Sequence, residues 1–126
     1  MTNFLGKKGE NIGAKYLKEK GYLIKERNFR RKWGEIDIVA YDRKTKEIVF
    51  LEVKTISLKK NISPLVLPEE GLTEKKRKRL KKAILSYLSQ DNLDNKPWRF
   101  DFIAIEIDKF TAKTNIRHYK NIFLEF

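Results

Sequence analysis

Two carboxylates and one lysine stand inside apolar stretches of this sequence, where a charged side chain is costly unless it has a partner. Asp37 lies in the run 34–40, and Glu52 and Lys54 lie in the run 48–54. The two acids could bind a divalent cation, and the lysine could stabilise negative charge that develops on a phosphate. The sequence therefore indicates metal-assisted attack on phosphate as candidate chemistry.

The two apolar runs predict a β-hairpin with strands at about 35–41 and 47–54, joined by a polar turn at 43–46. A hairpin centred on this turn pairs residues whose numbers sum to 89, which sets Asp37 directly opposite Glu52. Cross-strand Cβ atoms are roughly 4.5–5.5 Å apart, and two like charges at that separation are unfavourable unless a cation lies between them. The lysine two residues after Glu52 projects from the same face of its strand.

The expected ligands are all oxygen atoms, which suits Mg²⁺ or Mn²⁺. Asp37 and Glu52 would supply carboxylates, and the backbone carbonyl of Val53 would be a third ligand. Glu10 borders the apolar stripe of the first helix and could reach the same site, although a solvated surface acid is the alternative. Glu35 is a weaker alternative ligand.

Lys54 is expected to position the attacking water or to stabilise charge. It could act as a base only if its pKa were strongly lowered, and two nearby carboxylates would have the opposite effect. The alternative is that Glu52 and Lys54 are a common surface salt-bridge pattern.

A formal charge of +12, from 29 Lys and Arg against 17 Asp and Glu, favours a polyanionic partner. The apolar runs are far shorter than a membrane span and the N-terminus lacks a signal-peptide stretch, so nucleic acid, DNA above all, is favoured over a membrane. No cysteine is present, which is compatible with the cytoplasm. The length of 126 residues fits a single domain over 1–126.

Two basic clusters are the candidate nucleic-acid-binding residues. They comprise Lys75, Lys78, Arg79 and Lys82, opposite the apolar stripe of a helix, and Arg30, Arg31 and Lys32, just before the acids. Blocks of like charge repel one another and usually have an external reason, although a merely solvated helix face is the alternative. Trp33 could stack on a base or anchor a loop. His118, the single histidine, is expected to be structural or to contact phosphate.

The remaining patterns predict the order α-β-β-β-α-β-β and a mixed sheet with helices packed on it, an α/β fold. We expect a helix over 3–20 ended by Gly21 and a helix from Thr73 as N-cap to Asp91. The expected strands cover 22–31, 35–41, 47–54, 98–108 and about 115–119. Residues 55–72 are expected to form a long mobile loop.

The segments Gly34-Glu35-Ile36-Asp37 and Phe50-Leu51-Glu52-Val53-Lys54, at this spacing, are typical of one family, and weaker matches run over most of the chain. On these segments the sequence resembles the YraN family of small bacterial proteins. That family is related to the restriction-endonuclease-like PD-(D/E)XK superfamily. The resemblance implies a mixed sheet flanked by helices and Mg²⁺ or Mn²⁺ as cofactor.

By resemblance, Asp37 takes the superfamily's acid position, and Glu52 and Lys54 take its Glu-x-Lys pair. Glu10 resembles the first-helix acid of archaeal Holliday-junction resolvases in the same superfamily. One departure is Ile56, where family members usually carry Arg.

We therefore expect a metal-dependent endonuclease that hydrolyses phosphodiester bonds in DNA, with branched and single-stranded DNA as candidate substrates. Two alternatives stay open. One is a non-catalytic basic nucleic-acid-binding protein with a vestigial nuclease site, and the other is a protein that associates with anionic membranes. A homodimer is a candidate assembly.

Overall fold

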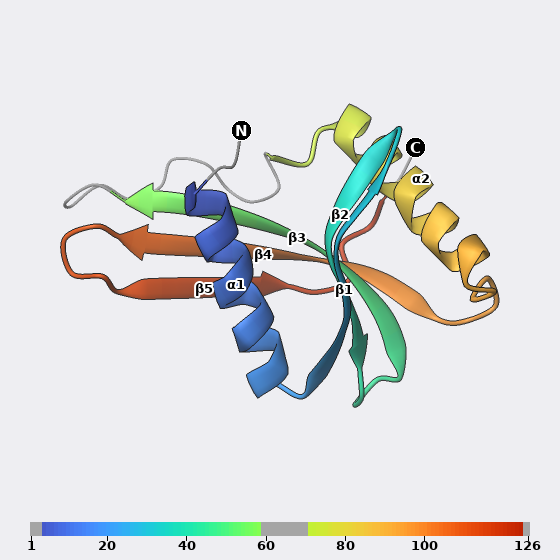
Figure 1. Ribbon diagram of the computed structural model, residues 1–126, viewed down its shortest axis with the longest axis horizontal. Helices are drawn as coiled ribbons and strands as arrows, with labels where there is room; N and C mark the ends of the chain where they lie inside the picture. The colour runs from blue at the N-terminus through green and yellow to red at the C-terminus, as the bar shows by residue number, and fades with distance from the viewer. Residues whose placement is uncertain (1–3, 59–70, 125–126) are drawn as a thin grey trace.

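The computed structural model describes residues 4–58 and 71–124 (Figure 1). Its elements are α1 (Phe4–Glu19), β1 (Tyr22–Arg31), β2 (Gly34–Asp42), β3 (Glu47–Leu58), α2 (Glu74–Gln90), β4 (Trp98–Asp108) and β5 (Thr114–Tyr119). The predicted order α-β-β-β-α-β-β is confirmed. Among the described residues, neither helix is long and apolar enough to cross a membrane.

The five strands form one mixed sheet in the order β1-β2-β3-β4-β5. β1, β2 and β3 are antiparallel neighbours, because short turns connect them. β4 runs parallel to β3, because the chain passes through α2 before it returns to the sheet. β3 is therefore the central strand, which explains why both of its faces carry apolar residues.

The hairpin of β2 and β3 has the predicted register. Its pairs run from Asp42 opposite Glu47 to Ile38 opposite Leu51, and each pair of numbers sums to 89. The recorded ladder ends at Ile38. Asp37 and the residue after Leu51 occupy the next position, where the two strands begin to separate.

The helices cover opposite faces of the sheet, which follows from the alternation of side chains along β3. Phe50 packs with Ile84 and Tyr87 of α2, whereas Leu51 packs with Leu17 of α1. All of these side chains are buried. Two apolar cores thus fix the sheet between α1 and α2 (Figure 1).

The β1–β2 ribbon changes face at Asp37. Ile36 packs in the core beneath α2, but Ile38, two residues later, packs in the core beneath α1. Residues two apart in a regular strand share a face, so the strand must rotate between them. In the register that pairs Phe29 with Ile36, Asn28 stands opposite Asp37 and has a left-handed φ of 55°. Asp37 therefore lies where the ribbon turns over, next to the central strand.

One predicted boundary is wrong. The strand expected at 47–54 continues to Leu58, because residues 55–58 pair in register with 105–108 of β4. The expected loop is therefore shorter at this end. Residues 59–70 lie outside the described part of the chain, and the predicted mobility of that segment stays a prediction.

The helix boundaries agree with the sequence patterns. Thr73 caps α2 as predicted, with its side-chain oxygen accepting a hydrogen bond from the backbone N–H of Lys76 at 3.2 Å. Gly21 follows α1 with a φ of 92°, a conformation that favours glycine. These caps fix where each helix begins or ends over the sheet.

Candidate metal centre and nucleic-acid interface

Asp37 is directed at the backbone of the central strand. Its Oδ2 accepts a hydrogen bond from the N–H of Val53 at 2.8 Å. Burial raises the pKa of Asp37 to about 7, and repulsion from Glu52, Glu10 and Glu35 acts in the same direction, against the lowering effect of the Val53 hydrogen bond. The hairpin therefore places this carboxyl in a desolvated position among three other acids.

Glu52 lies on the face of β3 that α2 covers, and its side chain is only 15% exposed. Lys76, in the first turn of α2, forms an ion pair with it at 2.9 Å between Nζ and Oε1. Lys54 follows on the same face of β3 and is exposed. It has no recorded hydrogen bond or ion pair with any described residue, so the cation that holds Glu52 is Lys76. Sequence reasoning missed this residue, because it treated the basic helix only as an exposed surface.

Glu10 approaches the hairpin because α1 lies very close to β3. A Cβ at Gly9 would come within 1.7 Å of Thr55 Oγ1, so only glycine fits there. Glu10 is the next residue. It pairs with Arg27 at 3.4 Å and is near enough to Asp37 to raise its pKa.

The acids around Asp37 suit a divalent cation that takes few protein ligands. Within residues 4–58 and 71–124, no three His, Cys, Asp or Glu side chains are close enough together to hold an ion as they stand. Of the nearby acids, Glu52 has the largest electrostatic effect on Asp37. Mg²⁺ commonly takes one or two carboxylates and completes its shell with water and substrate phosphate. The residues present therefore fit an open, oxygen-ligated site.

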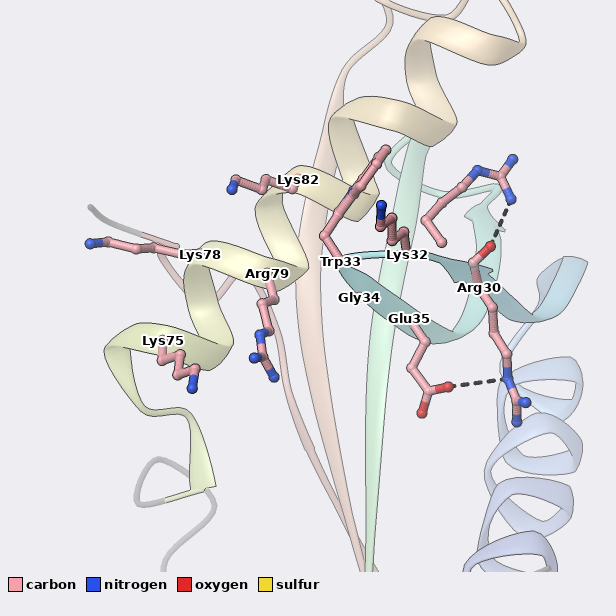
Figure 2. Close-up of a pocket in the computed structure, with 10 residues that line it drawn as sticks. Arg30, Lys32, Trp33, Gly34, Glu35, Lys75, Lys78, Arg79 and Lys82 are labelled. Carbon is pink, nitrogen blue, oxygen red and sulfur yellow. Dashed lines mark hydrogen bonds and ion pairs between the residues drawn. The ribbon is translucent and has the colours of Figure 1, made fainter. Parts of the chain in front are cut away.

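Both predicted basic clusters meet at one concave site, here called the basic hollow, with a volume of ≈ 660 Å³ (Figure 2). It is lined by Arg30, Arg31, Lys32, Trp33, Gly34, Glu35, Lys75, Lys78, Arg79 and Lys82. The tip of the β1–β2 hairpin forms one wall and α2 forms the other. The two walls touch at Gly34, where a Cβ would lie 2.9 Å from the carbonyl oxygen of Arg79.

Some of the hollow's cations are already paired. Arg30 pairs with Glu35 at 3.2 Å and Lys78 with Glu74 at 3.4 Å, while Arg31 donates to Gln90. The others have no recorded ion pair with any residue in the described ranges; they are Lys32, Lys75, Arg79 and Lys82. Because Gln90 is uncharged, Arg31 also keeps its charge, so five cations of the hollow have no acidic partner within 4–58 and 71–124.

A second charged cluster is buried beneath α1. Arg99 contacts Asp101 at 3.0 Å, Asp42 at 2.9 Å and the hydroxyl of Tyr22 at 2.8 Å. Burial by itself would raise the pKa of Asp101, but hydrogen bonds from His118 and Arg99 hold it below its ordinary value. The cluster ties β1, β2, β4 and β5 together.

His118 belongs to this buried cluster. Its Nε2 lies 2.7 Å from Asp101 Oδ2, its Nδ1 lies 3.1 Å from the hydroxyl of Tyr16, and its side chain is 5% exposed. This placement agrees with the structural role predicted for the histidine. The alternative of a phosphate contact does not fit so buried a side chain.

The fold and site together define a small mixed α/β protein with an acid pair beside a basic hollow. Residues 9–105 match the uncharacterised protein family UPF0102, the family of YraN, and the chain belongs to that family. A UPF0102 protein of Geotalea uraniireducens is 43% identical over 94% of this chain and 88% of its own length. One of Syntrophomonas wolfei is 38% identical over 98% of this chain and 100% of its own length. The resemblance seen in the sequence is confirmed.

Similarity to a solved structure is much weaker. An EndoMS–dsDNA complex is 17% identical, with a TM-score of 0.41 over 79% of this chain and 36% of that protein. A likeness this low carries no argument about function.

Proposed function

We propose that this protein is a metal-dependent nuclease that hydrolyses phosphodiester bonds in DNA. The observation that carries the proposal is the electrostatic interaction of Asp37 with Glu52, where the β1–β2 ribbon changes face, near a basic hollow. A buried acid whose pKa is strongly perturbed, in a site of this kind, is a candidate functional group. The repulsion between the acids would be relieved by a divalent cation.

Asp37 and Glu52 would hold Mg²⁺ or Mn²⁺, with the carbonyl of Val53 as a third ligand and Glu10 at the edge of the site. The ion would supply charge neutralisation at the scissile phosphate and a water of lowered pKa. Asp37 must lose its proton to bind, so its raised pKa makes metal affinity increase with pH up to about 7. Lys54, exposed beside Glu52, is free to orient water or to contact the phosphate.

The hollow supplies the affinity for DNA. Each phosphate neutralised by Lys or Arg releases counterions, and this contribution does not depend on sequence. The five cations of the hollow that lack an acidic partner among the described residues would anchor the DNA backbone near the acids.

Cleavage assays test this proposal directly. Single-stranded, flapped and branched DNA would be incubated with Mg²⁺ or Mn²⁺ and with the isosteric variants Asp37→Asn and Glu52→Gln. We expect both to lose activity by 100-fold or more, on the order expected when the residues that hold a catalytic metal are removed. Glu35→Gln, an exposed acid at the same site, is the matched control and should retain activity. Cleavage that survives in Asp37→Asn would refute the assignment.

A second candidate is a DNA-binding protein with a vestigial site, favoured by the ion pair of Lys76 with Glu52. In that case the lysine replaces the metal permanently. Calorimetry with Mn²⁺ separates the two. Binding that disappears in Glu52→Gln supports the nuclease, whereas no binding by the wild-type protein supports the second candidate.

A further inference from the structure

The shape of the basic hollow suits a single strand better than a duplex. Proteins read a duplex by inserting a protruding helix or β-ribbon into a groove. Here the hairpin tip and α2 form two walls around a concave site of ≈ 660 Å³ (Figure 2). Ligand sites commonly have volumes of roughly 300–1,000 Å³, so this open hollow has room for about one nucleotide.

The charges of the hollow are arranged on both walls. Lys32 stands on the hairpin tip, whereas Lys75, Arg79 and Lys82 stand on α2, and all four are exposed. No described residue forms a recorded ion pair with any of them. Like charges gathered around one hollow repel one another, so the phosphates of a bound strand would relieve this repulsion.

An aromatic ring lies among these cations. Trp33 lines the hollow, extends from the hairpin tip toward α2 (Figure 2), and is 43% exposed. An exposed ring within a basic groove is the arrangement that stacks bases of single-stranded DNA, whatever their identity.

The geometry points to an unpaired segment of DNA in the basic hollow, with its phosphates on Lys32, Lys75, Arg79 and Lys82 and one base stacked on Trp33. This inference rests on the proposed function, because it names the state of the DNA that the same site receives.

The hollow and the acidic site are formed by neighbouring residues of the same two elements. Glu35 lines the hollow and lies two residues from Asp37 along β2. On the opposite wall, Lys75 lines the hollow while its neighbour Lys76 contacts Glu52. A strand held in the hollow would therefore pass close to the elements that carry the two carboxylates.

Binding in EDTA tests the inference without any contribution from cleavage. The chain has two tryptophans, so the Trp98→Phe variant leaves Trp33 as the sole reporter. Its fluorescence would be titrated with a single-stranded oligonucleotide, with a duplex of equal length and with an abasic strand of equal length. We expect quenching by the single strand only. If Trp98→Phe does not fold, the difference in quenching between wild type and Trp33→Phe gives the same answer.

Affinities of labelled strands give the second measurement. Trp33→Ala should weaken binding of the single strand roughly 5- to 150-fold, the range that stacking of one base is worth, and Trp33→Phe should restore it. The abasic strand should bind Trp33→Ala as well as it binds wild type. Arg79→Gln should weaken all strands and reduce the dependence on salt by about 0.7 in log–log slope.

Two results would overturn the inference. Equal quenching by the duplex would show that no unpaired base is needed, and an equal loss of abasic binding in Trp33→Ala would show that the ring only supports the fold. A different result would refute the proposed nuclease function. A protein that binds as expected in EDTA but cleaves nothing with Mg²⁺ or Mn²⁺ would refute the nuclease and leave this inference standing.

Discussion

Replacing Asp37 by Asn should stabilise the fold above neutral pH. A carboxyl whose pKa is raised on folding binds its proton more tightly in the folded state, so stability falls as pH rises from the unfolded to the folded pKa. For Asp37 this window runs from its ordinary value of 3.8 to about 7. Asn keeps an oxygen that can accept the Val53 hydrogen bond but carries no charge, so the variant does not lose folding stability as the pH rises.

The size of the effect follows from the shift. One pKa unit corresponds to ~1.4 kcal/mol, so a shift of about three units sets a ceiling of ~4 kcal/mol. Water reaches the partly exposed carboxyl and screens its repulsion from the other acids, so we expect about 2–4 kcal/mol. The difference between variant and wild type should therefore be near zero at pH 3.5 and should reach this value by pH 8.

Urea unfolding in EDTA across this pH range measures the difference. Glu35→Gln is the matched control, because this acid is exposed and belongs to the same group of acids around Asp37. Its free energy of unfolding should stay within about 0.5 kcal/mol of the wild-type value. Adding Mn²⁺ at pH 8 should stabilise wild type but not Asp37→Asn. Parallel stability curves for wild type and Asp37→Asn from pH 4 to 8 would refute the reasoning.

Three further predictions concern packing and charge. Gly9→Ala should destabilise the fold by ~1–3 kcal/mol, because its Cβ would collide with Thr55. Gly13→Ala, whose Cβ would make an ordinary 3.5 Å contact, should stabilise the fold by up to ~1 kcal/mol. Thermal unfolding that ranks the two variants the other way would contradict this reasoning. Arg99→Met should cost ~3–5 kcal/mol in urea unfolding, since it leaves buried acids unpaired, and a loss below 1 kcal/mol would count against the cluster's role. Lys76→Met should raise Mn²⁺ affinity about fivefold in calorimetry, because the lysine no longer competes with the metal for the Glu52 carboxylate, an ion pair worth ~1 kcal/mol. Weaker Mn²⁺ binding by the variant would exclude such competition.

The sequence predicts most of the fold because its local signals agree with one another. Alternating apolar residues, a polar turn and a threonine cap fix the strands, the hairpin register and the start of α2, and all of these are confirmed. The end of β3 was missed because residues 55–58 are held by pairing with β4, fifty residues away. Local patterns carry no information about such a partner.

The candidate site was only partly predictable. Register alone indicates that Asp37 and Glu52 are neighbours, but the path of α2 over the sheet decides that Lys76 meets the second acid. The hollow likewise depends on that path, since its two basic clusters are more than forty residues apart. The cluster around Arg99 did leave a signal, because Arg99 and Asp101 are charged residues two apart among the aromatic residues that begin β4.

The parallel pairing of β3 with β4 has a consequence during synthesis. Every pair joins residues fifty positions apart, so the ribosome finishes β3 well before its neighbour exists. At about 5–20 residues per second, roughly 3–10 s elapse before β4 has been made. Throughout that interval one edge of a twelve-residue, mostly apolar strand is open to other nascent chains. Codon choice or chaperone supply along residues 59–97 would therefore affect the soluble yield of this protein more than it would affect the stability of the finished molecule.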